Sequence, residues 1–193
     1  MQGKSDVKTK GSKLTDMSES EIEQLIKECL AQNRNAQRTF YEIFYGFAMG
    51  ICLRYASNRY EAAEIMNKGF ENVFTCLNAY NYRYTFKAWL GKIMVNASID
   101  YYHDALKMTL TEDCDAEDFL INEVDPERRL SSNDLLAIIQ QLCPCYRIIF
   151  SLFAIEGHSH EEIAKMLNID PSTSESVLCK ARIQLMEIIL GVN

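Results

Sequence analysis

The chain has 193 residues, of which 48% are hydrophobic and 24% are charged, and its formal net charge is −7. This composition is that of a folded globular protein and argues against an intrinsically disordered chain. The length suits two small helical domains, and the negative balance argues against binding to nucleic acid by net charge alone. Seven cysteines, an odd number spread over the whole chain, do not suggest a disulfide framework. They suit a reducing compartment, so we expect a cytoplasmic protein.

The N-terminal segment and the longest apolar stretch both argue against a membrane protein. Residues 1–20 are polar and lysine-bearing and lack the apolar segment of a signal peptide, so we expect them to form a flexible tail. Residues 43–53 form the longest apolar stretch, which is too short to cross a bilayer. No membrane insertion is therefore expected.

The first half of the chain predicts four helices, because apolar residues recur there at three- and four-residue spacing. The expected ranges are 18–30, 37–56, 60–77 and 85–106. Ser18 and Glu21 form a capping box at the start of the first helix. In the second helix, Gly46 and Gly50 are expected to permit close packing. A tyrosine-rich connector, residues 78–85, separates the third and fourth helices.

The second half begins with an acidic stretch, residues 107–130, which lacks strong periodicity and is predicted to be a linker. Most of the negative balance lies in this stretch. A second helical domain is expected over residues 131–193. Its predicted helices span residues 133–142, 146–155, 160–167 and 172–190. A capping box from Ser159 to Glu162, a tight connection and a longer final helix predict a helix-turn-helix. The expected fold class is all-α, with two small helical domains joined by an acidic linker.

Two parts of the sequence resemble the extracytoplasmic-function (ECF) sigma factor family. Residues 61–74 are similar to the helix that docks on the clamp of RNA polymerase. Residues 86–102 resemble the promoter-melting helix, with its aromatic, tryptophan, asparagine and aspartate landmarks in order. Residues 142–182 resemble the domain that reads the upstream promoter element.

This resemblance implies a transcription initiation factor with a division of labour between its domains. Residues 21–106 would be a sigma region 2-like domain that binds polymerase and melts the minus-ten element. Residues 107–130 would pass near the RNA exit path, and residues 131–193 would be a sigma region 4-like domain that reads the minus-thirty-five element. The expected partners are core RNA polymerase and promoter DNA, with an anti-sigma factor as a further candidate.

Residue candidates follow from this reading and from the chemistry of the side chains. The outer face of the third helix is predicted to bind polymerase through Glu64, Asn67, Lys68 and Glu71. Opened DNA needs surfaces that hold unstacked bases, and the connector offers aromatic faces beside positive charge. The DNA candidates there and on the fourth helix are Tyr80, Tyr82, Arg83, Tyr84, Lys87, Lys92 and Asn96. The alternative is that the tyrosines cap the domain core, and Trp89 is expected to be core packing.

The last helix is the predicted recognition helix. Its DNA candidates are Ser172, Thr173, Glu175, Ser176, Lys180 and Arg182. Only the last two are basic, and the second domain is net acidic. This depletion motivates an alternative function, a sigma-like regulatory protein that binds polymerase or a regulator as a decoy without reading promoters.

An enzyme is not expected, because the sequence has no catalytic triad order, metal-ligand spacing or glycine-rich phosphate loop. No cofactor is expected either. Cys143 and Cys145, with the distant His158 and His160, are interpreted as structural thiols and not as metal ligands.

Overall fold

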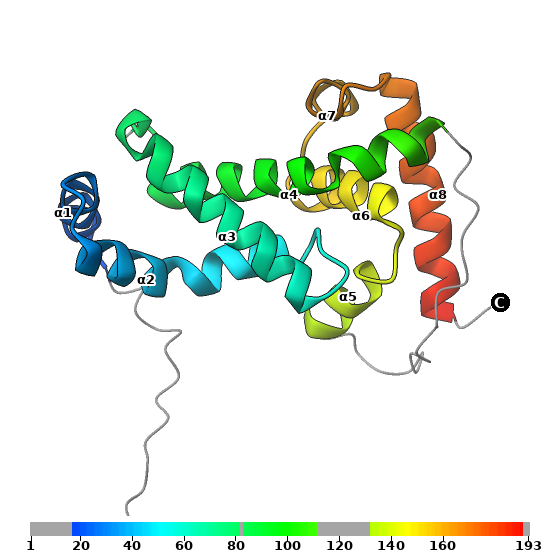
Figure 1. Cartoon of the computed structure of the whole chain (residues 1–193). Coiled ribbons are helices and arrows are strands. Elements are labelled where there is room, and N and C mark those ends of the chain that lie inside the picture. The colour runs from blue at the N-terminus through cyan, green and yellow to red at the C-terminus, as the bar shows by residue number, and fades with distance from the viewer. Residues whose placement is uncertain (1–16, 82, 112–131, 191–193) are drawn as a thin grey trace, which may run out of the picture.

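A computed structural model describes residues 17–81, 83–111 and 132–190 of the chain (Figure 1). All regular secondary structure in these ranges is helical, as predicted. The first domain contains α1 (Glu19–Leu30), α2 (Arg34–Cys52), α3 (Arg59–Cys76), the short η2 (Leu77–Ala79) and α4 (Phe86–Thr111). The second contains α5 (Ser132–Ile139), α6 (Pro144–Phe150), η3 (Ser151–Ile155), α7 (His160–Leu167) and α8 (Pro171–Leu190).

The helix boundaries follow local signals where the sequence supplies them. Ser18 and Ser159 each cap a helix in a capping box, with Glu21 and Glu162 as the respective partners. By contrast, α4 continues past the predicted end at residue 106 to Thr111, so the first residues of the predicted linker are helical. The rest of that linker and the predicted tail up to residue 16 lie outside the described residues.

The core of the first domain is a cluster of aromatic rings from three helices. Phe40 of α2 is fully buried, and its ring centroid lies 4.7 Å from that of Phe44, 5.5 Å from Phe74 and 5.5 Å from Phe86. Trp89 joins the edge of this cluster at 5.4 Å from Phe86, in keeping with the predicted packing role. The aromatic stripe of α2 therefore joins α2, α3 and α4 in one core.

Close packing between helices occurs at a different glycine from those predicted. Gly46 and Gly50 are exposed, and a Cβ at either would meet nothing within 4 Å, so the prediction for them is wrong. Gly69 of α3 is buried, and a Cβ there would overlap the Sδ atom of Met94 on α4. The close approach of α3 to α4 therefore depends on Gly69.

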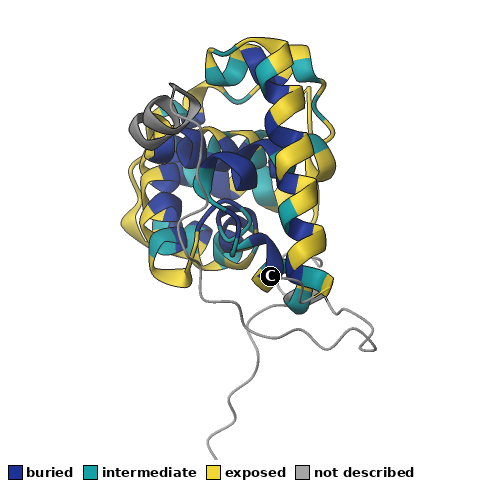
Figure 2. Ribbon diagram, turned by 90° about the vertical axis from the view of Figure 1, so that its right-hand side faces the viewer, coloured by how far each residue is buried: buried dark blue, intermediate teal, exposed yellow. Residues whose placement is uncertain are grey.

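The second domain is built around α8, which packs against α6 and α7. Asn168 adopts a left-handed conformation with φ of 54° and ends α7, which allows the tight turn into α8. The buried hydroxyl of Ser174 on α8 lies 2.9 Å from Nδ1 of His160 on α7. Buried residues gather between the helices, while their outer faces are exposed (Figure 2).

The two domains meet where α2 ends. In the turn that follows α2, three successive carbonyls accept hydrogen bonds from side chains of the second domain. Gln140 donates to the carbonyl of Leu53, Ser151 to that of Arg54 and Arg147 to that of Tyr55, each at 3.1 Å. We call these three acceptors the α2 carbonyls. They place α6 and η3 against the first domain, where α6 also lies against α4 (Figure 1).

Arg147 is the centre of this interface, since it is only 1% exposed. Besides its bond to the first domain, its Nη2 atom donates to the carbonyls of Gln140 at 3.0 Å and Leu142 at 2.6 Å. Burial lowers the pKa of Arg147, while Tyr102 and Glu61 oppose that shift. A partly exposed ion pair between Arg54 and Glu156, at 2.7 Å, lies at the edge of the same interface.

A polar cluster on the first domain faces this arginine. Tyr102 donates to Oε2 of Glu61 at 2.6 Å, and the backbone N–H of Ser57 donates to the same oxygen at 3.0 Å. Burial raises the pKa of Glu61, but hydrogen bonds from Ser57 and Tyr102 and the charge of Arg147 outweigh it and hold that pKa below its usual value. Burial and the bond to Glu61 raise the pKa of Tyr102 to about 12.

Candidate nucleic-acid interface

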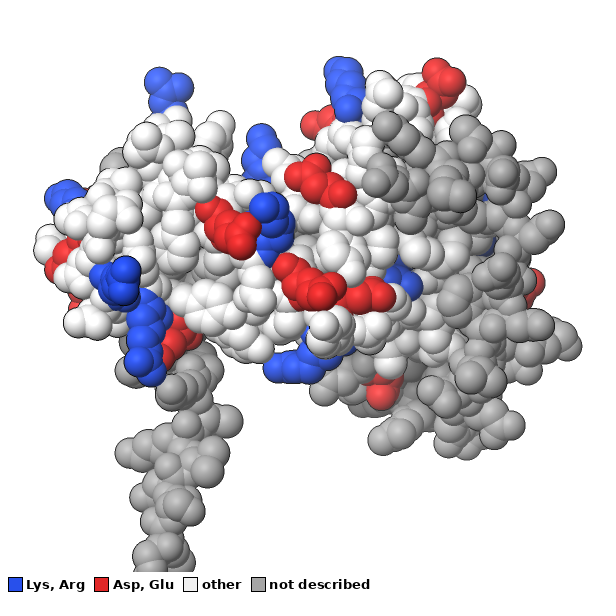
Figure 3. All heavy atoms as spheres, in the orientation of Figure 1, with Lys and Arg blue, Asp and Glu red and all other residues white. Residues whose placement is uncertain are grey.

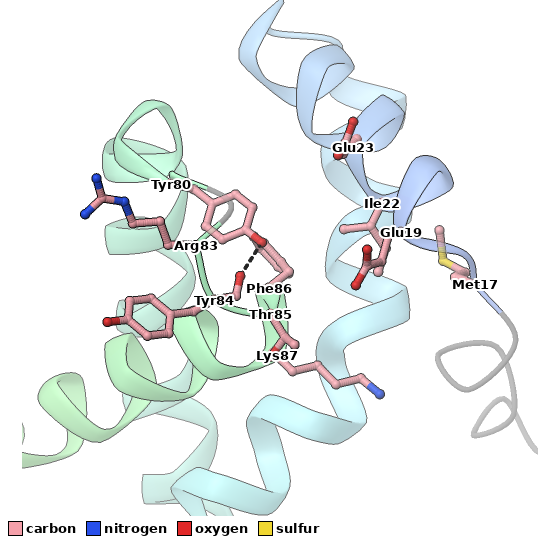
Figure 4. Close-up of a pocket in the computed structure, with 10 residues that line it drawn as sticks. All are labelled: Met17, Glu19, Ile22, Glu23, Tyr80, Arg83, Tyr84, Thr85, Phe86 and Lys87. Atoms are coloured by element: carbon pink, nitrogen blue, oxygen red, sulfur yellow. Dashed lines mark hydrogen bonds between the residues drawn. The ribbon is translucent and has the colours of Figure 1, made fainter.

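A pocket of about 470 Å³ opens between α1 and the tyrosine-rich connector (Figure 4). Its volume lies in the lower part of the range of ligand pockets. The α1 side is lined by Glu19, Ile22 and Glu23. The opposite side is lined by four predicted DNA contacts, which are Tyr80, Arg83, Tyr84 and Lys87. The structure thus gathers most of the connector candidates around one hollow.

The connector tyrosines divide between packing and exposure. Tyr80 packs its ring 5.2 Å from Phe86 and 5.4 Å from Trp89, and its hydroxyl donates to the carbonyl of Tyr84 at 2.8 Å. Tyr84 is 72% exposed, and Figure 4 shows its side chain and that of Arg83 on the side of the connector away from α1. Tyr82 lies outside the described residues. Tyr80 therefore caps the core, as the alternative interpretation had it, while Tyr84 offers a free aromatic face.

Aromatic, acidic and basic side chains line the pocket together. Tyr80 supplies the aromatic wall, and the carboxylates of Glu19 and Glu23 stand across from it. A carboxylate repels phosphate but accepts hydrogen bonds from the amino groups of cytosine and adenine. Arg83 and Lys87 also line the pocket and supply positive charge for a backbone phosphate. The arrangement therefore suits an unstacked base better than an isolated anion.

Lys92 and Asn96 lie one turn apart on α4 and are both exposed. They line a cleft of about 990 Å³ between the domains, together with Lys87. Lys165 of α7 lines the cleft from the second domain. In this arrangement of the domains, the part of α4 that carries Lys92 and Asn96 therefore points toward the second domain.

The predicted polymerase-binding residues form one exposed polar stripe on α3. Glu64 accepts a hydrogen bond from Tyr101 at 3.0 Å, and Asn67 accepts one from Tyr41 at 3.1 Å. Lys68 and Glu71 form an exposed ion pair at 2.9 Å. Acidic and basic side chains are interspersed on the face of the molecule that α3 crosses (Figure 3). A docking partner would meet a surface of mixed charge.

The start of α8 presents the predicted recognition residues outward. Its exposed candidates are Ser172, Glu175, Ser176, Lys180 and Arg182, while Thr173 is partly buried. The hydroxyl of Ser176 donates to the carbonyl of Thr173 at 3.0 Å. The guanidinium of Arg182 lies 5.6 Å from the ring centre of Phe153, so this arginine already has a partner within the domain.

Comparison with known proteins matches both domains. The Sigma-70 region 2 profile matches residues 40–107, and the Sigma-70 region 4 profile matches residues 132–185. The ECF RNA polymerase sigma factor SigE of Mycolicibacterium smegmatis is 31% identical over 143 residues, which cover 71% of this chain and 55% of that protein. SigW of Bacillus subtilis, also an ECF sigma factor, is 27% identical over 174 residues, which cover 83% of this chain and 92% of that protein. The chain belongs to the ECF sigma factor family.

As an ECF sigma factor, the chain serves transcription initiation by directing RNA polymerase to promoters. The decoy alternative is not favoured, because the matched relatives are named sigma factors. The family is one of transcription factors and not a known class of enzyme. Among solved structures, the sigma factor RpoE of Bartonella quintana, in complex with the anti-sigma factor NepR, aligns with a TM-score of 0.46. Its identity is 15%, over 81% of this chain and 97% of that one.

The sequence predicted no membrane insertion for this sigma factor, and the lengths and hydropathy of its helices bear on that prediction. Within residues 17–81, 83–111 and 132–190, none is long and apolar enough to cross a bilayer.

Two sets of residues in this sigma factor were missed from the sequence. Glu19 and Glu23 precede the segment that resembles region 2, and only the fold brings them to the connector. Arg147 lies in an apolar run, where a lone charge is a signal that a buried partner exists. The sequence offers no means of naming that partner, which is a backbone carbonyl 92 residues away.

Proposed function

We propose that this sigma factor opens promoter DNA with the connector and the pocket beside it, after core RNA polymerase has bound the α3 stripe. The observation that carries the proposal is the pocket of about 470 Å³, which is lined by an aromatic ring, acidic acceptors and two basic side chains. An unstacked base of the minus-ten element would enter the pocket. Tyr84, at 72% exposed, would stack on a neighbouring base.

The chemistry of the pocket favours certain bases. Glu19 and Glu23 accept hydrogen bonds, so a base with an exocyclic amino group, which is cytosine, adenine or guanine, is preferred over thymine. Arg83 and Lys87 would contact the phosphates on either side of that base. The pocket thereby adds sequence preference to the melting step.

The α3 stripe and α8 supply the other two contacts of the proposed function. Glu64, Asn67, Lys68 and Glu71 are exposed, which supports docking of α3 on polymerase. The N-terminal residues of α8, with Glu175 among them, would enter the major groove of the minus-thirty-five element. Lys180 and Arg182 would contact phosphates, and Arg182 would then exchange its contact with Phe153. Only two cations support this helix, so DNA affinity depends on tethering by polymerase.

Promoter binding also requires the two domains to separate. Lys92 and Asn96 line the cleft that faces α7, so duplex or melted DNA reaches them fully only after the cleft opens. Residues 112–130 would act as the linker that permits this separation. We infer a cytoplasmic location, where polymerase and promoter DNA are found, and an anti-sigma factor stays a predicted partner.

The test is promoter opening in vitro with core polymerase. Tyr84→Ala, alone and with Tyr82→Ala, is expected to reduce permanganate reactivity of thymines around the start site. A lost stack of about 1 to 3 kcal/mol corresponds to about 5- to 150-fold less open complex. Tyr84→Phe retains the ring and should match the parent protein, and polymerase affinity should be unchanged in all three variants.

A separate variant tests docking. Glu64→Arg, combined with Asn67→Ala, should lower affinity for core polymerase in a titration, because it reverses a charge and removes an amide on the α3 stripe.

Thymine reactivity in the Tyr84→Ala protein equal to that of the parent would refute the role of the connector. Suppression of transcription from other sigma factors, without promoter-dependent transcripts, would instead support a decoy.

A further inference from the structure

Two cysteine side chains meet at the start of α6, beside the domain interface. Cys143 is the N-cap residue of α6, and Cys145 is the second residue of the helix. Their Sγ atoms lie 3.3 Å apart, and neither forms a disulfide. Cys143 is partly exposed, whereas Cys145 is only 1% exposed. One sulfur is thus open to a small reagent while its neighbour is shielded.

The backbone between them holds this geometry. Pro144 occupies the first position of α6, and its ring fixes the φ angle of the residue that separates the two thiols. Cys143 itself is extended, with φ of −60° and ψ of 155°. The folded backbone therefore holds the two cysteines at a fixed separation, at which their sulfurs come into contact.

A buried positive charge accompanies the pair. The backbone N–H of Arg147 donates to the carbonyl of Cys143 at 3.0 Å, and Cys143 is among the groups that raise the pKa of Arg147 against the effect of burial. The thiolate is the reactive form of cysteine. In the described residues, no group of three or more His, Cys, Asp or Glu side chains is arranged to hold a metal ion, so two sulfurs in contact suit disulfide chemistry better.

We propose that Cys143 and Cys145 form a redox-active dithiol that a peroxide oxidises to a disulfide and that thereby loosens the domain interface. The Cys143 thiolate attacks one peroxide oxygen, breaks the O–O bond and becomes a sulfenic acid, while the other oxygen leaves as water after taking up a proton. Cys145 then attacks the sulfenic sulfur, and the hydroxyl group leaves as a second water. The two thiols lose two electrons and two protons in total, and the peroxide takes up both.

The structural consequence follows from the position of the pair. A disulfide requires the sulfurs to approach from 3.3 Å to about 2.05 Å, which pulls on the segment around Pro144. The carbonyl of Leu142, next to Cys143, accepts the shortest hydrogen bond of Arg147, at 2.6 Å. Arg147 in turn donates to the α2 carbonyl of Tyr55. Strain at the dithiol therefore reaches the contact that joins the two domains.

The full-length protein tests the chemistry directly. It is treated with hydrogen peroxide, alkylated and digested with trypsin, which releases residues 130–147 with Cys143 and Cys145 as the only cysteines. The expected peptide has lost two hydrogen atoms and carries no alkyl group. Cys179→Ser, which removes an exposed thiol on α8, should give the same product, whereas Cys145→Ser should not.

Hydrogen exchange then tests the coupling to the interface. Amides of residues 53–56 are hydrogen-bonded within the first domain, and their exchange should rise about tenfold on oxidation of the parent protein. This factor corresponds to about 1.4 kcal/mol. Cys145→Ser treated in the same way should show no rise. The proposal is overturned if the peptide stays fully alkylated, if Cys143 gains oxygen without disulfide formation, or if the disulfide forms and exchange is unchanged.

Discussion

Replacement of Arg147 by methionine probes the interface between the domains. Methionine keeps much of the length and volume of the side chain but removes its charge and all of its hydrogen bonds. The parent arginine makes three bonds to backbone carbonyls, and a hydrogen bond to a charged group is worth about 1.5 to 3 kcal/mol. The burial of a guanidinium opposes this gain, so the full sum is not realised.

The expected net loss for Arg147→Met is about 3 to 5 kcal/mol, because three carbonyls lose their donor at about 1 to 3 kcal/mol each and relief of the buried guanidinium offsets part of that sum. Only one of the three bonds crosses to the first domain, so the smaller part of the loss belongs to the interface. Urea unfolding of the full chain measures the total. Arg147→Lys keeps the charge but not the planar fork of donors, so it should lose less than the methionine variant.

The measured loss of stability shows whether the hydrogen bonds of Arg147 outweigh the cost of burying its guanidinium. If the free energy of unfolding of Arg147→Met lies within about 0.5 kcal/mol of that of the parent, the cost of burying the guanidinium cancels the gain from its hydrogen bonds. The α2 carbonyls would then gain nothing from this side chain. Such a result would refute Arg147 as the centre of the interface.

Three further outcomes are expected. Gly69→Ala should destabilise the protein by about 1 to 3 kcal/mol in urea unfolding, because its Cβ overlaps Met94. Gly46→Ala, which meets nothing, should stabilise it by up to about 1 kcal/mol, and equal effects would refute the packing argument. Because the pKa of Glu61 is lowered in the folded protein, its ionised carboxylate stabilises the fold at pH values above its usual pKa of 4.5. This stabilisation is lost as the pH falls through the folded-state pKa. Glu61→Gln should therefore lose less stability than the parent between pH 5 and the acid limit, and parallel pH curves would contradict this. Ser159→Ala should cost about 0.5 to 2 kcal/mol through loss of its cap, whereas an unchanged midpoint would show that Glu162 suffices.

Local signals in the sequence predicted local structure well. The boxes at Ser18 and Ser159 depend on residues three positions apart, so each can be identified without the rest of the fold. The predicted span of α7, residues 160–167, is confirmed. At the end of α4 there is no comparable stop signal, and the helix continues to Thr111 where a linker had been predicted.

Features that depend on residues far away in the chain could not be predicted from the sequence. Gly46 and Gly69 are glycines in neighbouring helices, and only the position of Met94 distinguishes the second one, where an added Cβ would overlap a side chain. The segment predicted as one helix over residues 146–155 ends in a π-helix, η3, whose first residue, Ser151, donates to an α2 carbonyl. Periodicity describes one helix face at a time and cannot reveal such a contact between domains.

The candidate site was predicted in part for the same reason. The spacing of Lys92 and Asn96 places them on one face, and the structure has both of them exposed on the wall of one cleft. The pocket beside the connector required Glu19 and Glu23 from α1, which are some 60 residues earlier in the chain. Charge pattern alone could not bring these carboxylates to the tyrosines.

The α2 carbonyls also bear on how the protein folds during synthesis. They are complete when residue 55 leaves the ribosome, but their donors, Gln140, Arg147 and Ser151, follow about 90 residues later. At about 5 to 20 residues per second, the nascent end of α2 waits roughly 5 to 20 seconds for them. During this interval the end of α2 is accessible to water, to chaperones or to polymerase itself. The order of translation thus gives the first domain a period in which no second domain exists to cover it.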